Sequence, residues 1–196
     1  MMLRQALAAA ASKQGAASSD YDLNADAAAP KRELRAAGVL IAVVESEDPR
    51  LILTKRSSAL KHHPGQIAFP GGKVETSDRD VVAAALREAE EEITLTGAEV
   101  VGTLAPHETV TGFNVTPVLG VVQPGYFAQP DEREVAEVFE VPLRHVLNPQ
   151  NYMIESRLWR GQRRHFFAVP WGPYYIWGAT ARMLRALADR MADETT

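Results

Sequence analysis

The sequence of 196 residues contains no cysteine, and it has no apolar run that approaches the length of a membrane span. The lack of cysteine excludes disulfides, thiolate chemistry and cysteine zinc sites, and it is compatible with a reducing compartment. Without a spanning segment, no membrane partner is expected. We therefore expect a cytoplasmic protein.

The chain also has fewer basic than acidic residues. Lysine and arginine number 21 against 25 acidic residues, which gives a formal net charge of −4 and no general attraction to nucleic acid or to anionic membranes. A hydrophobic content of 46% and a charged content of 23% are those of a soluble globular protein, and the length fits one domain. An acidic protein of this kind needs local cations or a bound metal to act on an anionic substrate.

Strand and helix patterns interleave along the chain without internal repeats. The predicted strands cover residues 38–45, 51–56, 99–105, 113–122 and 135–141, with a hairpin formed by 151–159 and 163–169. A final helix is predicted from about 176 to 191, and another helix in the second half of 71–95. This alternation indicates an α/β layered domain.

Residues 1–36 are interpreted as an N-terminal arm, and residues 37–192 as the folded domain. The arm is expected to begin as a short helix and to continue as a loose segment from Gly15 to Pro30. The apolar face of that helix would be formed by Leu3, Leu7 and Ala10. A targeting peptide is the alternative, because no acid precedes Asp20. Since the arm lacks a strong core pattern, its first 19 residues are expected to be dispensable for folding.

An acidic helix face stands out between Gly71 and Leu95. Glu88, Glu91 and Glu92 fall at i, i+3 and i+4, where like charges repel. A hard divalent cation would turn this cost into a gain, because Mg²⁺ prefers carboxylate and phosphate oxygens. The opposite face carries an apolar stripe of Val82, Ala85, Leu86, Ala89 and Ile93. A solvated acidic surface is the alternative interpretation of the three carboxylates.

The order of these parts resembles the Nudix box, G-x5-E-x7-R-E-U-x-E-E-x-G-U. Gly72 takes the first glycine, and the R-E…E-E core falls on Arg87, Glu88, Glu91 and Glu92. The loop is one residue longer than in the general box, and Asp78 stands where the loop glutamate is usual. Thr94 replaces the glycine that ends the helix, so the turn is expected to close without the usual left-handed residue.

A second motif lies directly upstream of this one. Residues 52–72 read ILTKRSSALKHHPGQIAFPGG and resemble LLTxRSx3Rx3Gx3FPGG, the signature of coenzyme A pyrophosphatases. Lys61 stands where that family has arginine, so the charge is kept but the bidentate fork is lost. Further likeness at 107–117 and 175–184 extends the resemblance over most of the chain from residue 37 to 184.

The resemblance implies a Nudix-type α/β/α sandwich with a mixed β-sheet that hydrolyses the diphosphate bond of coenzyme A or its acyl derivatives. The products would be 3′,5′-ADP and (acyl-)4′-phosphopantetheine. The catalytic residues would be Arg87, Glu88, Glu91 and Glu92, with Mg²⁺ or Mn²⁺ held by the three glutamates. The substrate-binding residues would be Arg56, Lys61, Gly65, Phe69, Gly71 and Gly72.

Several alternatives stay open at the level of sequence. One alternative is that the substrate is another nucleoside diphosphate derivative, such as ADP-ribose or a dinucleotide. A second alternative is that the chain is a non-catalytic Nudix-fold binding module. For Arg56 itself, the alternative is an ordinary ion pair with an acid of the fold. The general base is a glutamate of the cluster or one of Asp78, Glu108 and Glu134. A homodimer is left open.

Overall fold

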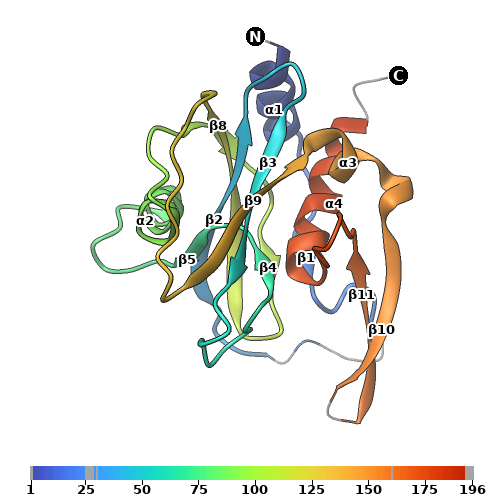
Figure 1. The fold of residues 1–196 in the computed structure, drawn as a ribbon. Helices are drawn as coiled ribbons and strands as arrows, with labels where there is room; N and C mark the ends of the chain where they lie inside the picture. Colours follow the sequence, from blue (N-terminus) through green and yellow to red (C-terminus); the bar gives the residue numbers. More distant parts are fainter. Residues whose placement is uncertain (1, 25–28, 30, 160, 193–196) are drawn as a thin grey trace.

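A mixed sheet lies between two layers of helices in the computed structural model, which describes residues 2–24, 29, 31–159 and 161–192 (Figure 1). The strands are β1 (Ser18–Ser19), β2 (Arg35–Val44), β3 (Arg50–Arg56), β4 (Ile67–Ala68), β5 (Gly71–Lys73), β6 (Glu99–Thr103), β7 (His107–Glu108), β8 (Phe113–Val122), β9 (Val135–Pro142), β10 (Met153–Trp159) and β11 (Gln162–Ala168). The helices are α1 (Met2–Ser12), α2 (Val81–Ile93), α3 (Leu143–Leu147) and α4 (Ala179–Ala192), with a 3-10 turn at Pro149–Asn151.

The strand order β1-β7-β8-β2-β3-β4 defines the main sheet, with β5 joined to β2, β6 to β8 and β9 to β3. The pairs β2–β8 and β1–β7 are parallel and the other pairs are antiparallel. The predicted α/β/α sandwich with a mixed sheet is therefore confirmed. None of the helices in the described part of the chain is long and apolar enough to cross a membrane.

Strand β2 supplies both hydrophobic cores of the sandwich. Ile41 and Val43 face the core that α1, α3 and α4 cover, whereas Leu40 and Ala42 face the core under α2. Alternate side chains of a strand point to opposite faces, so a strand buried on both sides is apolar throughout. The predicted α2 stripe is confirmed, since its alanines and Ile93 are buried and its other members pack against them.

The predicted hairpin is confirmed by β10 and β11, which pair antiparallel on either side of the Gly161 turn. Helix α4 begins at Ala179, three residues later than expected. Gly178 has φ +65° and its N–H donates to the carbonyl of Phe167 at 3.0 Å, so this residue still belongs to the connection that lies against β11. Its carbonyl then accepts the first helical bond, from Arg182 at 2.8 Å.

The N-terminal arm packs onto the sheet, contrary to our expectation from the sequence. Leu7 and Ala10 of α1 are fully buried in the core shared with α4. Removing residues 1–19 would empty part of that core, so we no longer expect the fold to tolerate this deletion. The expected loose segment falls partly on residues 25–28 and 30, which lie outside the described residues.

A buried histidine ties the end of the arm to the sheet. The ring of His107 is fully buried, with Nδ1 2.9 Å from Ser18 Oγ and Nε2 3.1 Å from Asp20 Oδ1. The other carboxylate oxygen of Asp20 accepts the N–H of Val110 at 2.8 Å. Two adjacent segments, β1 and the loop after β7, are thereby held together by one side-chain network.

We predict that Ser18→Ala lowers the free energy of unfolding by about 1–3 kcal/mol, because one ring nitrogen of buried His107 loses its partner. Urea denaturation would measure the change. The matched control is Ser12→Ala, which removes an exposed hydroxyl from the same arm and should change stability by less than about 0.5 kcal/mol. Equal stability of the two variants would show that the network contributes nothing.

Candidate active site

Helix α2 has defined caps at both ends. The side chain of Asp80 accepts the N–H of Ala83 at 2.8 Å and so caps the N-terminus of the helix. At the other end, Thr94 itself adopts the left-handed conformation, with φ 57° and ψ 22°. The expectation that the turn closes without a left-handed residue was therefore wrong. A threonine accepts this conformation at a cost of roughly 1–2 kcal/mol.

The two glycines before the helix bring the chain against it. Gly71 and Gly72 pair with Val39 and Gly38 of β2. Gly71 has φ +154°, and a Cβ there would lie 2.4 Å from the carbonyl oxygen of Gly38. A Cβ on Gly72 would lie 2.3 Å from Oε1 of Glu88. Only glycine therefore allows the backbone to lie directly beside the first carboxylate of the cluster.

Arg87 contacts most members of the acidic cluster, which consists of Asp78, Glu88, Glu91 and Glu92. Its Nε and Nη2 donate to the two oxygens of Asp78 at 2.9 and 3.0 Å, a bidentate fork. Its Nη1 donates to Glu88 at 3.1 Å and to Glu91 at 2.9 Å, and Nη2 also reaches the carbonyl of Lys73 at 3.2 Å. The contact with Glu91 joins residues at i and i+4 of the helix, and the pKa of Arg87 is raised, first of all by the bond to Asp78.

Asp78 thus orients the arginine, which explains the acid at this position of the loop. The Arg87 guanidinium and the N–H of Glu75 hold the pKa of Asp78 below its usual range. We predict that Asp78→Asn lowers kcat about 10-fold and leaves KM nearly unchanged, because a partner of this kind acts through the residue that it orients. Steady-state kinetics would test this, with Asp80→Asn as the control that keeps an N-cap. Loss of kcat in the control variant as well would contradict the assignment.

Glu92 and Glu88 are poorly solvated carboxylates. Glu92 is only 4% exposed, and burial raises its pKa to about 7 despite the bond of 3.1 Å from the N–H of Gly71. Burial also raises the pKa of Glu88, although Arg87 opposes the shift. Glu134 adds like charge to both groups. The cluster therefore holds more negative charge than its neighbours neutralise.

That excess of buried negative charge fits a hard divalent cation. The donor set consists of carboxylate oxygens, and the glycine backbone leaves room at Glu88 that any other residue would fill. Among the described residues, no three Asp, Glu or His side chains are already arranged around a common metal position. The Nη1 of Arg87 bonds both Glu88 and Glu91, so these two carboxylates share one guanidinium donor.

Arg56 joins the upstream motif to this cluster. It ends β3, and its Nη1 lies 3.9 Å from Oε1 of Glu92. The Nε of Arg56 is buried, and within the described residues it has no hydrogen-bond partner. A cation that is 25% exposed and only partly bonded can accept a further anion. The two motifs are therefore adjacent in the structure.

The other predicted binding residues differ in their positions. Gly65 lies beside Arg56, to whose carbonyl its N–H donates at 3.1 Å, and Lys61 is exposed on the same loop. Phe69 is 3% exposed in the core with α4, which favours a packing role for its side chain, and its place among the binding residues stays a prediction. Its apolar character alone could not distinguish packing from stacking on a base.

The three acids outside the helix differ in their surroundings. Both oxygens of Asp78 are occupied by Arg87, and Glu108 lies 3.7 Å from Arg32 in an ion pair. Glu134 is exposed and near enough to Glu88 and Glu92 to raise their pKa values. Of the three acids, Glu134 therefore has the surroundings of a residue of the site.

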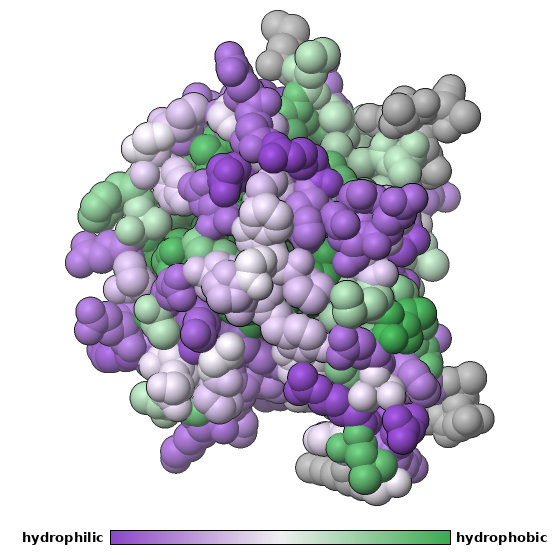
Figure 2. Space-filling model, turned by 45° about the vertical axis from the view of Figure 1, so that its right-hand side comes forward, coloured by the Kyte–Doolittle hydropathy of each residue, from purple (hydrophilic) through white to green (hydrophobic). Residues whose placement is uncertain are grey.

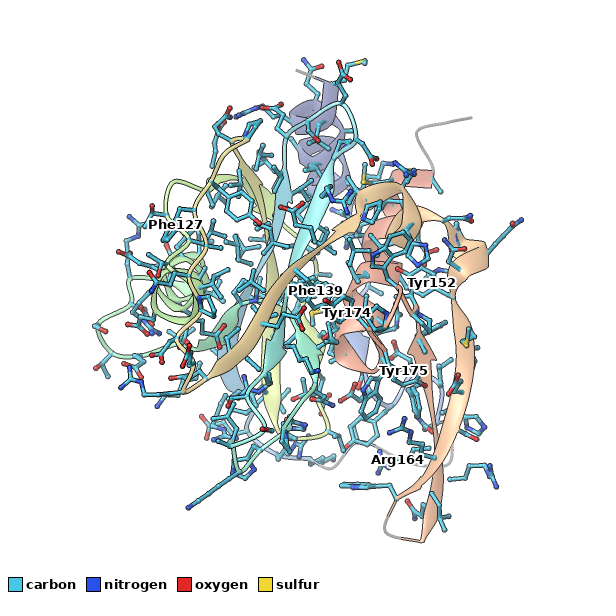
Figure 3. The ribbon with its side chains drawn as sticks, in the orientation of Figure 1. Phe127, Phe139, Tyr152, Arg164, Tyr174 and Tyr175 are labelled. Carbon is cyan, nitrogen blue, oxygen red and sulfur yellow. The ribbon has the colours of Figure 1, made fainter. Side chains whose placement is uncertain are left out.

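The loop that carries Glu134 is docked on the C-terminal end of α2. The N–H groups of Gln129 and Asp131 donate to the carbonyls of Ile93 and Glu92, both at 2.9 Å. The same loop exposes Phe127 at 68% on the side of the molecule that carries α2 (Figure 3). Phe127 was not among the residues predicted from the sequence, although an aromatic residue in an acidic loop was a signal for a binding position. Exposed aromatic rings can stack on bases.

Comparisons with known proteins agree on one family. A model described as the NUDIX domain matches residues 34–160. The protein called "Uncharacterized Nudix hydrolase NudL" in Enterobacter sp. is 44% identical over 156 residues, covering 79% of this chain and 81% of the relative. The protein of the same name in Citrobacter koseri is 45% identical over the same shares.

Solved structures show the same fold at low sequence identity. A MutT protein from Methanosarcina mazei Go1 has a TM-score of 0.52 and 18% identity, with 86% of this chain and 99% of that chain covered. The NUDIX domain of Shewanella oneidensis NrtR complexed with ADP ribose has a TM-score of 0.51 and 18% identity, with 88% and 97% covered.

Proposed function

The chain belongs to the Nudix hydrolase family and is a Nudix diphosphatase, and we propose that its substrate is coenzyme A or an acyl-coenzyme A. Its substrate class is that of nucleoside diphosphate derivatives, which it hydrolyses. The products of the proposed reaction are 3′,5′-ADP and (acyl-)4′-phosphopantetheine. One observation carries the proposal: Arg56 of the coenzyme A signature lies 3.9 Å from Glu92 of the acidic helix.

The charges around this point support a polyanionic substrate. Arg56 keeps a buried, unpartnered Nε among the described residues, and Lys61 is exposed on the loop that follows β3. His63 lies on the same loop, and its pKa is lowered, first by burial and then by the nearby charge of Arg56. Coenzyme A carries a diphosphate and a 3′-phosphate, so it offers anions both to a local cation and to a metal held by the helix.

We assign the metal to Glu88, Glu91 and Glu92. Enzymes of this family generally use divalent metals, and Mg²⁺ or Mn²⁺ would neutralise the diphosphate and lower the pKa of bound water. Other residues of the chain orient the carboxylates and bind the phosphate oxygens. Arg87 orients Glu88 and Glu91, while Gly71 holds Glu92 through its N–H. Arg56 fixes phosphate oxygens on the side of the buried carboxylate.

We assign the proton acceptor to Glu134. It is exposed to solvent beside the cluster, whereas Asp78 and Glu108 are engaged by arginines. An exposed carboxylate near the buried pair can take the proton of the attacking water.

The decisive experiment compares coenzyme A, 3′-dephospho-coenzyme A and ADP-ribose in the presence of Mg²⁺ or Mn²⁺, with products identified by mass spectrometry. The proposal expects the highest kcat/KM for coenzyme A or an acyl derivative, and release of 3′,5′-ADP. A higher kcat/KM for ADP-ribose or a dinucleotide would favour the alternative substrate class. Binding of coenzyme A without any metal-dependent hydrolysis would favour the binding module.

A further inference from the structure

Strand β10 has one paired edge and one edge that no described residue covers. Its pairing with β11 runs from Met153 opposite Ala168 to Trp159 opposite Gln162. The far edge of β11 is covered, because the Asn24 side chain bonds both the N–H and the carbonyl of His165, at 2.8 and 3.0 Å. Figure 1 shows β10 as the outer strand of a hairpin that stands apart from the main sheet. An uncovered edge of this length is a template for another strand.

The polar groups on that free edge can be identified from the register. Residues of an antiparallel ladder alternate between bonding one neighbour and bonding the other. His165 and Phe167 bond away from β10, to Asn24 and to Gly178. Their partners in the register are Ser156 and Ile154, so these residues direct their N–H and carbonyl groups to the free edge. Leu158 follows in the same alternation.

The sequence of β10 is self-complementary about its middle residue. It reads MIESRLW, with Glu155 and Arg157 on either side of Ser156. In an antiparallel pair of two copies centred on Ser156, Glu155 lies opposite Arg157 of the partner subunit, twice. A pair centred on Glu155 or on Arg157 would set like charges opposite each other, which is destabilising. Charge therefore selects one register, and that register also matches the outward-facing backbone groups.

The same register covers the apolar side chains of the strand. Ile154 and Leu158 are 58% and 74% exposed, and Met153 and Trp159 are 45% and 42% exposed. Pairing about Ser156 sets isoleucine opposite leucine on one face of the new sheet and methionine opposite tryptophan on the other. Figure 2 shows hydrophobic patches among polar ones on the side of the molecule that the hairpin occupies.

The two charges are held in place before any partner arrives. Glu155 accepts the hydroxyl of Tyr175 at 2.5 Å, and Arg157 lies with its guanidinium 4.9 Å from the centre of the Trp177 ring. Tyr175 is beside the hairpin in Figure 3. Side chains fixed in this way lose little conformational entropy when a second strand pairs with them.

We propose that the chain forms a homodimer in which the β10 strands of two copies pair antiparallel about Ser156. The product is a four-stranded sheet, β11-β10-β10-β11, across a two-fold axis. Helix α2 lies on the other side of the main sheet from the hairpin (Figure 1), so each copy keeps its own complete active site. The occupant of the free edge is therefore a second copy of this chain.

Sedimentation equilibrium over a range of concentrations tests the dimer. The wild type is expected at twice the mass of the 21.4 kDa chain. Ser156→Pro should be monomeric, because proline removes an N–H that faces the free edge and leaves the β10–β11 bonds intact. Ser156→Ala keeps that N–H and should remain dimeric. Circular dichroism and unchanged hydrolysis per chain would show that the proline variant is folded. A wild type that is monomeric throughout, or a folded proline variant that is dimeric, would overturn the proposal.

A charge exchange tests the register itself. Glu155→Arg alone and Arg157→Glu alone each set like charges opposite each other at two places, and each should weaken the dimer at least about 10-fold. An equimolar mixture of these two variants should form heterodimers, because every opposed pair is then complementary. The double variant should dimerise by itself. Equal self-association of the single variants and the wild type would exclude this register.

Discussion

Glu88→Gln and Glu92→Gln are each expected to lower kcat by at least about 100-fold while leaving the chain folded. A bound metal contributes several kcal/mol of charge stabilisation in the transition state, and a neutral amide holds it poorly. Glutamine keeps the shape and one acceptor oxygen, so the bond from the N–H of Gly71 to residue 92 can persist. The measurements are steady-state kinetics with coenzyme A and a titration of Mg²⁺ followed by calorimetry.

The same two variants should differ from wild type in stability, and the size of the difference depends on pH. Burial raises the pKa of Glu92 in the folded protein to about 7, above the ordinary value of 4.5. An ionised carboxylate then destabilises the folded state, and this loss grows as the pH rises from 4.5 through 7. Without metal, Glu92→Gln should therefore exceed the stability of wild type more at pH 8 than at pH 5.

Glu90→Gln is the matched control, because it removes the same charge from an exposed position of the same helix. It should keep the kcat and metal affinity of wild type. Near-wild-type turnover in both Glu88→Gln and Glu92→Gln would remove the metal role from these residues. A loss of kcat in all three variants would show that total helix charge matters, and not the positions.

Local patterns predicted the acidic helix well, since periodicity is a property of neighbouring residues. The spacing of Glu88, Glu91 and Glu92 and the contact from Arg87 to Glu91 needed no tertiary information. Thr94 was mispredicted because tertiary contacts override propensity: its hydroxyl donates to the carbonyl of Gln129 at 3.1 Å, and this bond helps to hold the left-handed turn.

Long-range packing explains the other differences. The burial of Leu7 depends on β6 and α4, and its pattern in the arm is too short to reveal them. Asp20 meets His107 across 87 residues, a contact that no local spacing encodes. Phe69 belongs to a motif associated with substrate, yet it lies in the core because alternate residues of this segment face opposite ways.

Arg56→Ala is expected to lower kcat/KM for coenzyme A roughly 10- to 150-fold, the loss of one charge-assisted contact of about 1.5–3 kcal/mol. The Nε of Arg56 is buried without a partner among the described residues, and its Nη1 lies 3.9 Å from Glu92. The guanidinium is therefore only partly hydrogen-bonded, and a phosphate would accept its remaining N–H groups. Arg56→Lys is the matched control, since it keeps the charge without the planar fork. It should recover only part of the loss.

The pattern over substrates identifies the phosphate that Arg56 binds. If the arginine grips the 3′-phosphate, Arg56→Ala should raise KM for coenzyme A and change the kinetics of 3′-dephospho-coenzyme A much less. If it grips the diphosphate, both substrates should lose alike, and kcat should fall as well because the contact strengthens in the transition state. Unchanged kinetics on both substrates together with a lower melting temperature would show that Arg56 only balances the charge of Glu92. Coenzyme A would then have no support from the upstream motif, while the metal role of the acidic helix would stand.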